Sequence, residues 1–138
     1  MKSIPLSKFI DSYNEIIPNI QDKYIQDNIL LINDYIDLQT KIEKISKIIS
    51  SSFEKENQNA SSIYRYVSFV IYLIESYTNL QVDIDLYKAY DLLKSNNLLD
   101  KVLIMIPDAE ICESQKFVDM ILNDVIYFKK GERINGEN

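Results

Sequence analysis

The stretch that decides the fold is Ser61–Leu80, SSIYRYVSFVIYLIESYTNL. Its apolar residues recur at spacings of three and four, which is the period of a helix. Aromatic and aliphatic residues fill most of the remaining circumference, so this helix is expected to be buried on nearly every side. The unbroken apolar run is only Phe69–Ile74, whereas a membrane span needs about 20 apolar residues. We therefore predict a core helix and no membrane span.

The ends of this helix carry residues that are typical of helix caps. Ser61 and Ser62 are expected at its N-terminus, because a hydroxyl can accept from the exposed amides of a first turn. Asn79 is expected near its C-terminus, where its tolerance of left-handed dihedral angles is useful.

The composition predicts an all-α protein. The chain has 138 residues, about one domain, with only two glycines and three prolines. Strand-rich folds need many tight turns built from those residues, so their scarcity favours long helices joined by short polar links. We predict a compact single-domain bundle of about six or seven helices around the central helix at 61–80. Residues 1–130 are expected to form the domain, and 131–138 a disordered C-terminal tail.

Three helices are expected before the central one, over 3–17, 20–32 and 35–53. We place a break at Asn33–Asp34 with Asp34 as a cap, and one continuous helix through 20–53 is the alternative. The polar residues 50–59 are expected to form a loop or a frayed helix end. Expected inward positions are Leu6, Phe9, Ile10 and Tyr13 in the first helix and Ile36, Leu38, Ile42, Ile45, Ile48 and Ile49 in the third.

Three further helices are expected after the central one. Asp83 or Asp85 should cap a helix over 86–95, and Asn97 should cap a short, mostly buried helix over 98–106. The last helix is expected to begin at Pro107 and to end at Lys130, with Gly131 as its C-cap. Acidic residues near its start and basic residues near its end agree with the helix dipole.

The sequence lacks the residues of the common catalytic, cofactor and metal sites. It has no histidine, one cysteine, and two glycines that both follow residue 130. These absences exclude a histidine general base, a CxxC site and a glycine-rich phosphate loop. We interpret Asp108, Glu110 and Glu113 as helix-start charges, and Cys112 as a small packing residue. We predict a protein that is not an enzyme and has no catalytic residues, no cofactor and no metal site.

The net charge of −6 bears on the class of partner. Binding to nucleic acid usually needs a basic surface, so the acidic balance argues against it. Because we see no N-terminal signal pattern, we expect the protein in the cytoplasm when made.

Tyrosine is the one compositional excess, with ten residues. Tyrosine is enriched at interfaces because it offers a large rigid surface with a polar tip. The alternative is that an Ile-, Asn-, Lys- and Tyr-rich chain reflects an AT-rich genome and that the rings fill the core. The candidate interaction surface consists of Tyr24, Tyr35, Tyr64, Tyr66, Tyr87 and Tyr90.

The C-terminal half carries a resemblance. The segments at 77–107, YTNLQVDIDLYKAYDLLKSNNLLDKVLIMIP, and at 117–125, FVDMILNDV, resemble small uncharacterised all-α proteins from phages of AT-rich Gram-positive bacteria. The features that carry it are the YTNL link, the YDLL–SN–LLDKV block and the IP before the acidic helix. The resemblance implies a phage or prophage origin, with the host cytoplasm or the virion as location, and transfers no catalytic residue.

Three functional hypotheses follow. The first is a structural or assembly component of the virion, such as a head–tail junction adaptor, that works through contacts with itself or with other phage proteins. The second is a small acidic inhibitor that binds a host defence protein, as anti-CRISPR proteins do. The third is a regulatory binding module. The first predicts an exposed apolar or tyrosine-rich surface that assembly covers.

Overall fold

The computed structural model describes the backbone of residues 3–54 and 58–136 and the side chains of residues 3–54 and 61–127. Within these residues the fold is all-α apart from two very short strands, as the composition predicts. The helices are α1 (Leu6–Asn14), α2 (Gln21–Asn28), α3 (Leu38–Phe53), α4 (Gln58–Tyr77), α5 (Leu86–Ser95), α6 (Leu99–Leu103) and α7 (Asp108–Gly136), with a 3-10 turn at Pro18–Ile20 and strands β1 (Ile4–Pro5) and β2 (Leu80–Gln81).

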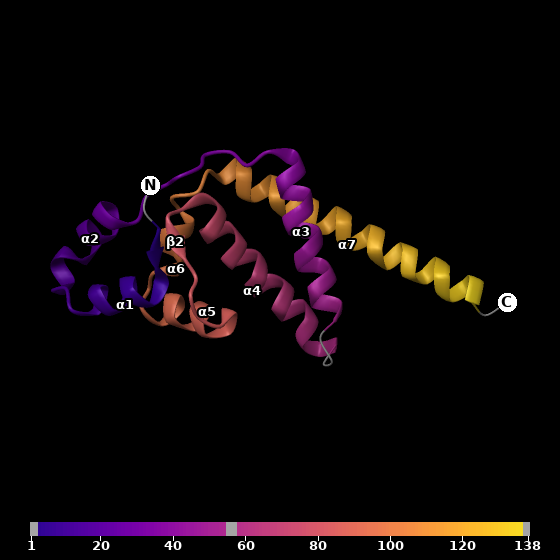
Figure 1. The fold of residues 1–138 in the computed structure, drawn as a ribbon, viewed down its shortest axis with the longest axis horizontal. Coiled ribbons are helices and arrows are strands. Elements are labelled where there is room, and N and C mark those ends of the chain that lie inside the picture. Colours follow the sequence, from indigo (N-terminus) through magenta and orange to yellow (C-terminus); the bar gives the residue numbers. More distant parts are fainter. Residues whose placement is uncertain (1–2, 55–57, 137–138) are drawn as a thin grey trace.

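Helix α4 lies in the middle of the molecule, between α3 on one side and α5 on the other (Figure 1). Every residue from Val67 to Ile74 is buried, which confirms the prediction of a central core helix. Two hydrophobic clusters share this helix. It supplies Val67, Val70, Ile71 and Ile74 to the first cluster and Phe69, Tyr72, Leu73 and Tyr77 to the second.

The first cluster joins α4 to α1, α2, α5 and α6. Helix α1 buries Leu6, Phe9, Ile10 and Tyr13 in it, the face that the sequence predicts. The other contributions come from α2 and the residue after it, from β2, from α5 and from α6; they are Ile25, Ile29, Leu80, Ala89, Leu93, Leu98, Leu99 and Val102.

The second cluster packs α3 and α7 against α4. Its buried residues outside α4 are Ile45 and Ile49 of α3, Ile106, and Val118 of α7. Two of the predicted inward positions of α3 are wrong, since Leu38 is 54% exposed and Ile42 is 39% exposed. Leu38 is the first residue of α3, and Ile42 lies at the edge of the face that carries Lys41, Ile45 and Ile49.

The break between the second and third helices is confirmed, but its cap is not Asp34. Helix α2 ends at Asn28, and α3 begins at Leu38 after Asp37, whose carboxylate accepts a hydrogen bond from the Thr40 N–H at 3.1 Å. The intervening residues are extended and lie along the end of α4. The Ile32 N–H donates to the Tyr77 carbonyl at 2.8 Å, and Leu31 forms an antiparallel bridge with Thr78.

The short strands also gather at this end of α4. Strand β1 pairs in parallel with β2, with Ile4 opposite Leu80, and the Ile4 N–H donates to the Asn79 carbonyl at 2.8 Å. Asp83 completes the junction, because its carboxylate accepts hydrogen bonds from the Ser7 backbone N–H and hydroxyl in the first turn of α1. Asp83 therefore caps α1, across 76 residues, and not the helix that follows it.

The caps around α5 are of two kinds. Asp85 accepts from the N–H groups of Tyr87 and Lys88, as predicted, and α5 covers Leu86–Ser95 as expected. Asn97 does not cap α6; it has a φ of 57° and ends α5 instead. The Leu98 N–H reaches back to the Leu93 carbonyl at 2.8 Å, the pattern of a Schellman motif.

Other boundaries differ from the sequence prediction. Ser61 and Ser62 lie inside α4, and Ser50, Ser51 and Ser52 lie inside α3. The Ser52 hydroxyl donates to the Ile49 carbonyl at 2.6 Å, so it is satisfied within a helix. Ile104, expected to be buried, is 84% exposed. Of the polar residues expected to form a loop, 55–57 lie outside the described residues.

Helix α7 continues through Gly131 to Gly136, so neither the predicted C-cap nor the predicted tail over 131–136 is correct. One glycine in a helix costs only about 1 kcal/mol relative to alanine, and no proline follows to stop the helix. The rest of the predicted tail, 137–138, lies outside the described residues.

Candidate functional site

Four of the six candidate tyrosines form two pairs that join α4 to α5. The rings of Tyr64 and Tyr87 meet edge to face at 6.4 Å between centroids, and those of Tyr66 and Tyr90 do so at 6.0 Å. Edge-to-face contact of this kind adds about 0.5–1.5 kcal/mol beyond the burial of area. Tyr66 is still 53% exposed and Tyr87 is 43% exposed, so the pairs pack the helices together and also present aromatic surface.

The other two candidates lie elsewhere. Tyr24 on α2 stacks on Phe9 at 5.5 Å and packs against the first hydrophobic cluster. Tyr35 lies in the extended segment before α3, is 59% exposed, and has the Lys41 ammonium 4.6 Å from its ring centroid. The six tyrosines therefore do not form one continuous patch.

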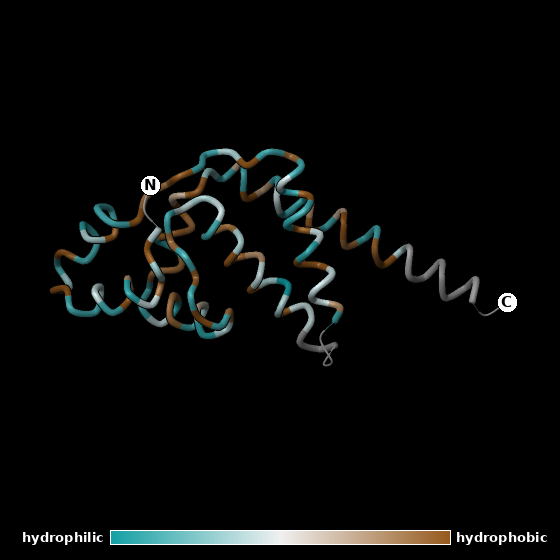
Figure 2. Tube along the Cα trace, viewed as in Figure 1, coloured by the Kyte–Doolittle hydropathy of each residue, from teal (hydrophilic) through white to brown (hydrophobic). Residues whose placement is uncertain are grey.

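Helix α7 presents a second surface, which tyrosine counting alone does not reveal. It crosses α3 and extends well beyond the rest of the molecule (Figure 1), and hydrophobic residues continue along it past the crossing (Figure 2). Met120 is 53% exposed and Tyr127 is 81% exposed; they are seven residues apart and so share a helix face. Ile126 is 39% exposed. We call these three residues the α7 surface.

A buried ionic cluster holds the N-terminal end of α7 against α3 and α4. The Lys41 ammonium on α3 has no exposed area and lies 2.9 Å from Glu110 Oε1 and 2.8 Å from Glu113 Oε1, both on α7. Glu110 Oε1 also accepts from the Tyr77 hydroxyl of α4 at 2.8 Å and from the Ile36 N–H at 3.1 Å. One carboxylate thus holds three helices and the segment before α3.

The pKa shifts describe a cluster that stays ionised. Burial alone would raise the pKa of Glu110, but hydrogen bonds from Lys41, Tyr77 and Ile36 outweigh burial and lower it. Burial would lower the pKa of Lys41, but its bonds to Glu113 and Glu110 raise it. Burial and the bond to Glu110 raise the pKa of Tyr77 far above its usual range. The shifts agree with the geometry, in which the ionised cluster anchors α7 to α3 and α4.

The sequence did not predict this cluster, because Glu110 and Glu113 were interpreted as charges that stabilise the start of a helix. One signal was present: Lys41 precedes Ile45 and Ile49 by four and eight residues and so lies on the buried face of α3. A lysine on the buried face of a helix needs a carboxylate partner, because an unpaired buried charge is costly.

Other features expected from the sequence can be placed. Cys112 is exposed on α7, with its Sγ 3.8 Å from Asp108 Oδ2, so it is not a packing residue. Among the described side chains, no three of the ligand-forming types (His, Cys, Asp, Glu) gather as they would around a metal ion. No helix in the described part of the chain combines the length and the hydropathy that a membrane crossing needs.

Comparisons with protein-family models, curated proteins and solved structures gave no match for this chain.

Proposed function

We propose that this chain acts through protein–protein contacts, without catalysis, as a structural or assembly component of a phage particle such as a head–tail junction adaptor. The observation that supports this proposal is the α7 surface. It places two apolar side chains more than half exposed, Met120 and Tyr127, on a helix that extends beyond the body of the molecule.

The physical argument starts from the marginal stability of lone helices. Helical stability in proteins comes mostly from the packing of an apolar face, and short isolated helices are marginal in water. The Lys41–Glu110 contact and the second hydrophobic cluster hold the first turns of α7 and one side of its middle. A second protein that covers Met120 and Tyr127 would stabilise the outer part of α7 by burying area that is now exposed.

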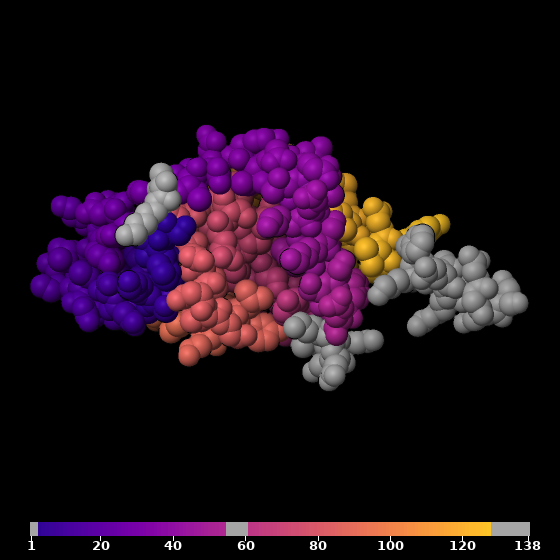
Figure 3. Space-filling view, viewed as in Figure 1, coloured from indigo at the N-terminus to yellow at the C-terminus, as the bar shows by residue number. Residues whose placement is uncertain are grey.

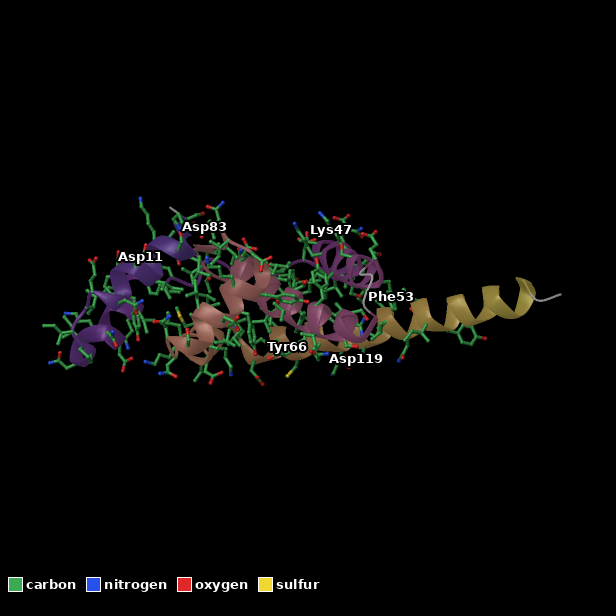
Figure 4. The ribbon with its side chains drawn as sticks, turned by 90° about the horizontal axis from the view of Figure 1, so that it is seen from below. Asp11, Lys47, Phe53, Tyr66, Asp83 and Asp119 are labelled. Atoms are coloured by element: carbon green, nitrogen blue, oxygen red, sulfur yellow. The ribbon has the colours of Figure 1, made fainter. Side chains whose placement is uncertain are left out.

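The partner that we propose first is another copy of this chain, as in a ring. Figure 4 places Tyr66 and Asp119 next to each other on the side of the body opposite Lys47, so α4 adds aromatic surface beside α7. Tyrosine and methionine are both enriched at interface cores, and the charged residues that flank them suit a polar rim.

The test is the solution mass of the full chain by light scattering over a concentration series. The variant carries Met120→Lys and Tyr127→Lys, and the matched control carries Ile104→Lys and Leu38→Lys, which change exposed apolar residues on other elements. We expect a closed ring, or a mass that grows with concentration, for the wild type and the control, and a monomer for the α7 variant.

A monomer or dimer whose mass does not change with concentration would contradict assembly into a ring. It would favour the competing hypothesis of an acidic inhibitor of a host defence protein. Equal loss of assembly in the control would show that the α7 surface is not the interface.

A further inference from the structure

A groove lies between α3, α4 and the start of α5, apart from the residues that the proposed assembly uses. Its volume is about 650 Å³, which lies within the range of about 300–1,000 Å³ that small-molecule sites occupy. In the space-filling view, α3 borders the surface of α4 and α5 on this face (Figure 3). The α7 surface is not part of its lining.

One buried hydroxyl in the lining has no hydrogen-bond partner. Ser68 on α4 is only 8% exposed, and its Oγ forms no hydrogen bond, whereas the hydroxyl of Tyr72, one turn later, lies near Ser114 of α7. A buried hydroxyl left without a partner costs about 1–3 kcal/mol. Such groups in a native fold point to something that binds there, either ordered water or a ligand.

The rim of the groove carries cations in a chain of net charge −6. Lys44 and Lys47 are one turn apart on α3, and both line the groove. No ion pair in the described part of the chain uses either of them. Glu75 also lines the groove, but its carboxylate accepts from the Val82 N–H at 3.2 Å and so is held toward the α4–α5 link.

The floor of the groove is partly apolar, with Ile48 and Ile71 among its lining residues. The groove therefore combines an apolar floor, the buried Ser68 hydroxyl and two ammonium groups without an ion-pair partner.

We propose that this groove binds a small organic anion. Its apolar body would lie on Ile48 and Ile71, its anionic group would lie between Lys44 and Lys47, and the Ser68 hydroxyl would donate to one of its oxygens. The anionic group is a carboxylate or a phosphate, since both accept from ammonium and hydroxyl donors.

The test titrates the ¹⁵N-labelled full chain with octanoate, octyl phosphate and 1-octanol and follows the backbone amide signals by NMR. We expect saturable shifts centred on Lys47, Ser68 and Tyr72 with one or both anions, and the stronger of the two identifies the anionic group. The uncharged alcohol should bind about tenfold more weakly, because it forms no ion pair.

A variant with Lys44→Gln and Lys47→Gln should weaken anion binding by about tenfold, to the level of the alcohol. The matched control has Lys23→Gln and Lys88→Gln, which remove the same charge from exposed positions on α2 and α5. It should bind as the wild type does. Equal binding of octanol and the stronger of the two anions, equal loss in the control, or no saturable shift at these amides would overturn the proposal.

The self-assembly proposal and the anion-binding proposal can be contradicted independently of each other. The α7 variant should still bind the anion, and the Lys44/Lys47 variant should still assemble.

Discussion

The Tyr77 hydroxyl at the end of α4 donates to the Glu110 carboxylate near the start of α7 at 2.8 Å, and Glu110 also receives the buried Lys41 ammonium. Thirty residues lie between the end of α4 at Tyr77 and the start of α7 at Asp108, but this contact joins the two helices directly. The Glu110 carboxylate therefore links the start of α7 to both α3 and α4.

Replacing Lys41 with methionine should destabilise the fold by about 3–5 kcal/mol, because Glu110 would stay buried without its cation. The free energy of unfolding from urea denaturation measures this loss. The control is Lys44→Met, an exposed lysine on the same helix, which should change it by no more than about 0.5 kcal/mol. The double variant Lys41→Met, Glu110→Gln should lose less than the sum of the two single changes; simple additivity would contradict the coupling.

Stability should fall in acid, and Glu110 should account for part of the fall. Its folded pKa lies below the ordinary value of 4.5, so its contribution is present above that pH and is lost as the pH falls through the folded value. Lys41 behaves in the opposite sense: its pKa is raised from 10.5, so its contribution is complete below that pH and is lost as the pH rises above it.

The measurement compares the free energy of unfolding of the wild type and of Glu110→Gln between neutral pH and about pH 3. We expect a shallower acid decline in the variant. Asp37 and Asp83, whose pKa values are lowered by hydrogen bonds from Thr40 and Ser7, would supply part of the decline that remains. Identical slopes for the two proteins would show that Glu110 does not contribute.

The turn after α5 offers a test of backbone geometry. Asn97 has a φ of 57°, a region that costs an alanine roughly 1–2 kcal/mol, so Asn97→Ala should lower the free energy of unfolding by about 1 kcal/mol. Asn97→Gly should be neutral or slightly stabilising, because glycine has no Cβ. The control is Ser95→Ala, an exposed position inside the helix, which should change little. A destabilising glycine would contradict the argument from φ.

The central position of α4 predicts that alanine substitutions along this helix lower the free energy of unfolding by unequal amounts. Leu73 is 2% exposed, so Leu73→Ala should cost about 2–5 kcal/mol in thermal or chemical unfolding. Ile63, ten residues earlier on the same helix, is 60% exposed, and Ile63→Ala should stay within about 0.5 kcal/mol. Similar costs at both positions would be inconsistent with burial that begins at Val67.

The predictable parts of the fold are those that local signals define. The buried face of α1, the core character of α4, the extent of α5 and the Asp85 cap all depend on residues within a few positions of one another. The α2–α3 break is also local, although its cap lies three residues later than expected, at Asp37.

The missed features join distant residues. Glu110 binds Lys41 across 69 residues, and Asp83 caps α1 across 76 residues, so periodicity cannot reveal either pairing. The candidate tyrosines divide in the same way: the sequence places Tyr64, Tyr66, Tyr87 and Tyr90 on helices, but only the packing of α4 against α5 makes them pairs.

The pairing of Ile4 with Leu80 has a consequence for the order in which the chain can fold during synthesis. While the ribosome is still making residues before 80, α1 has neither its strand partner nor the Asp83 carboxylate that caps it. The α3–α4 hairpin depends on nearer contacts and can form first. Helix α1 should therefore dock after the α3–α4 hairpin has formed, and until then its apolar face is exposed to chaperones.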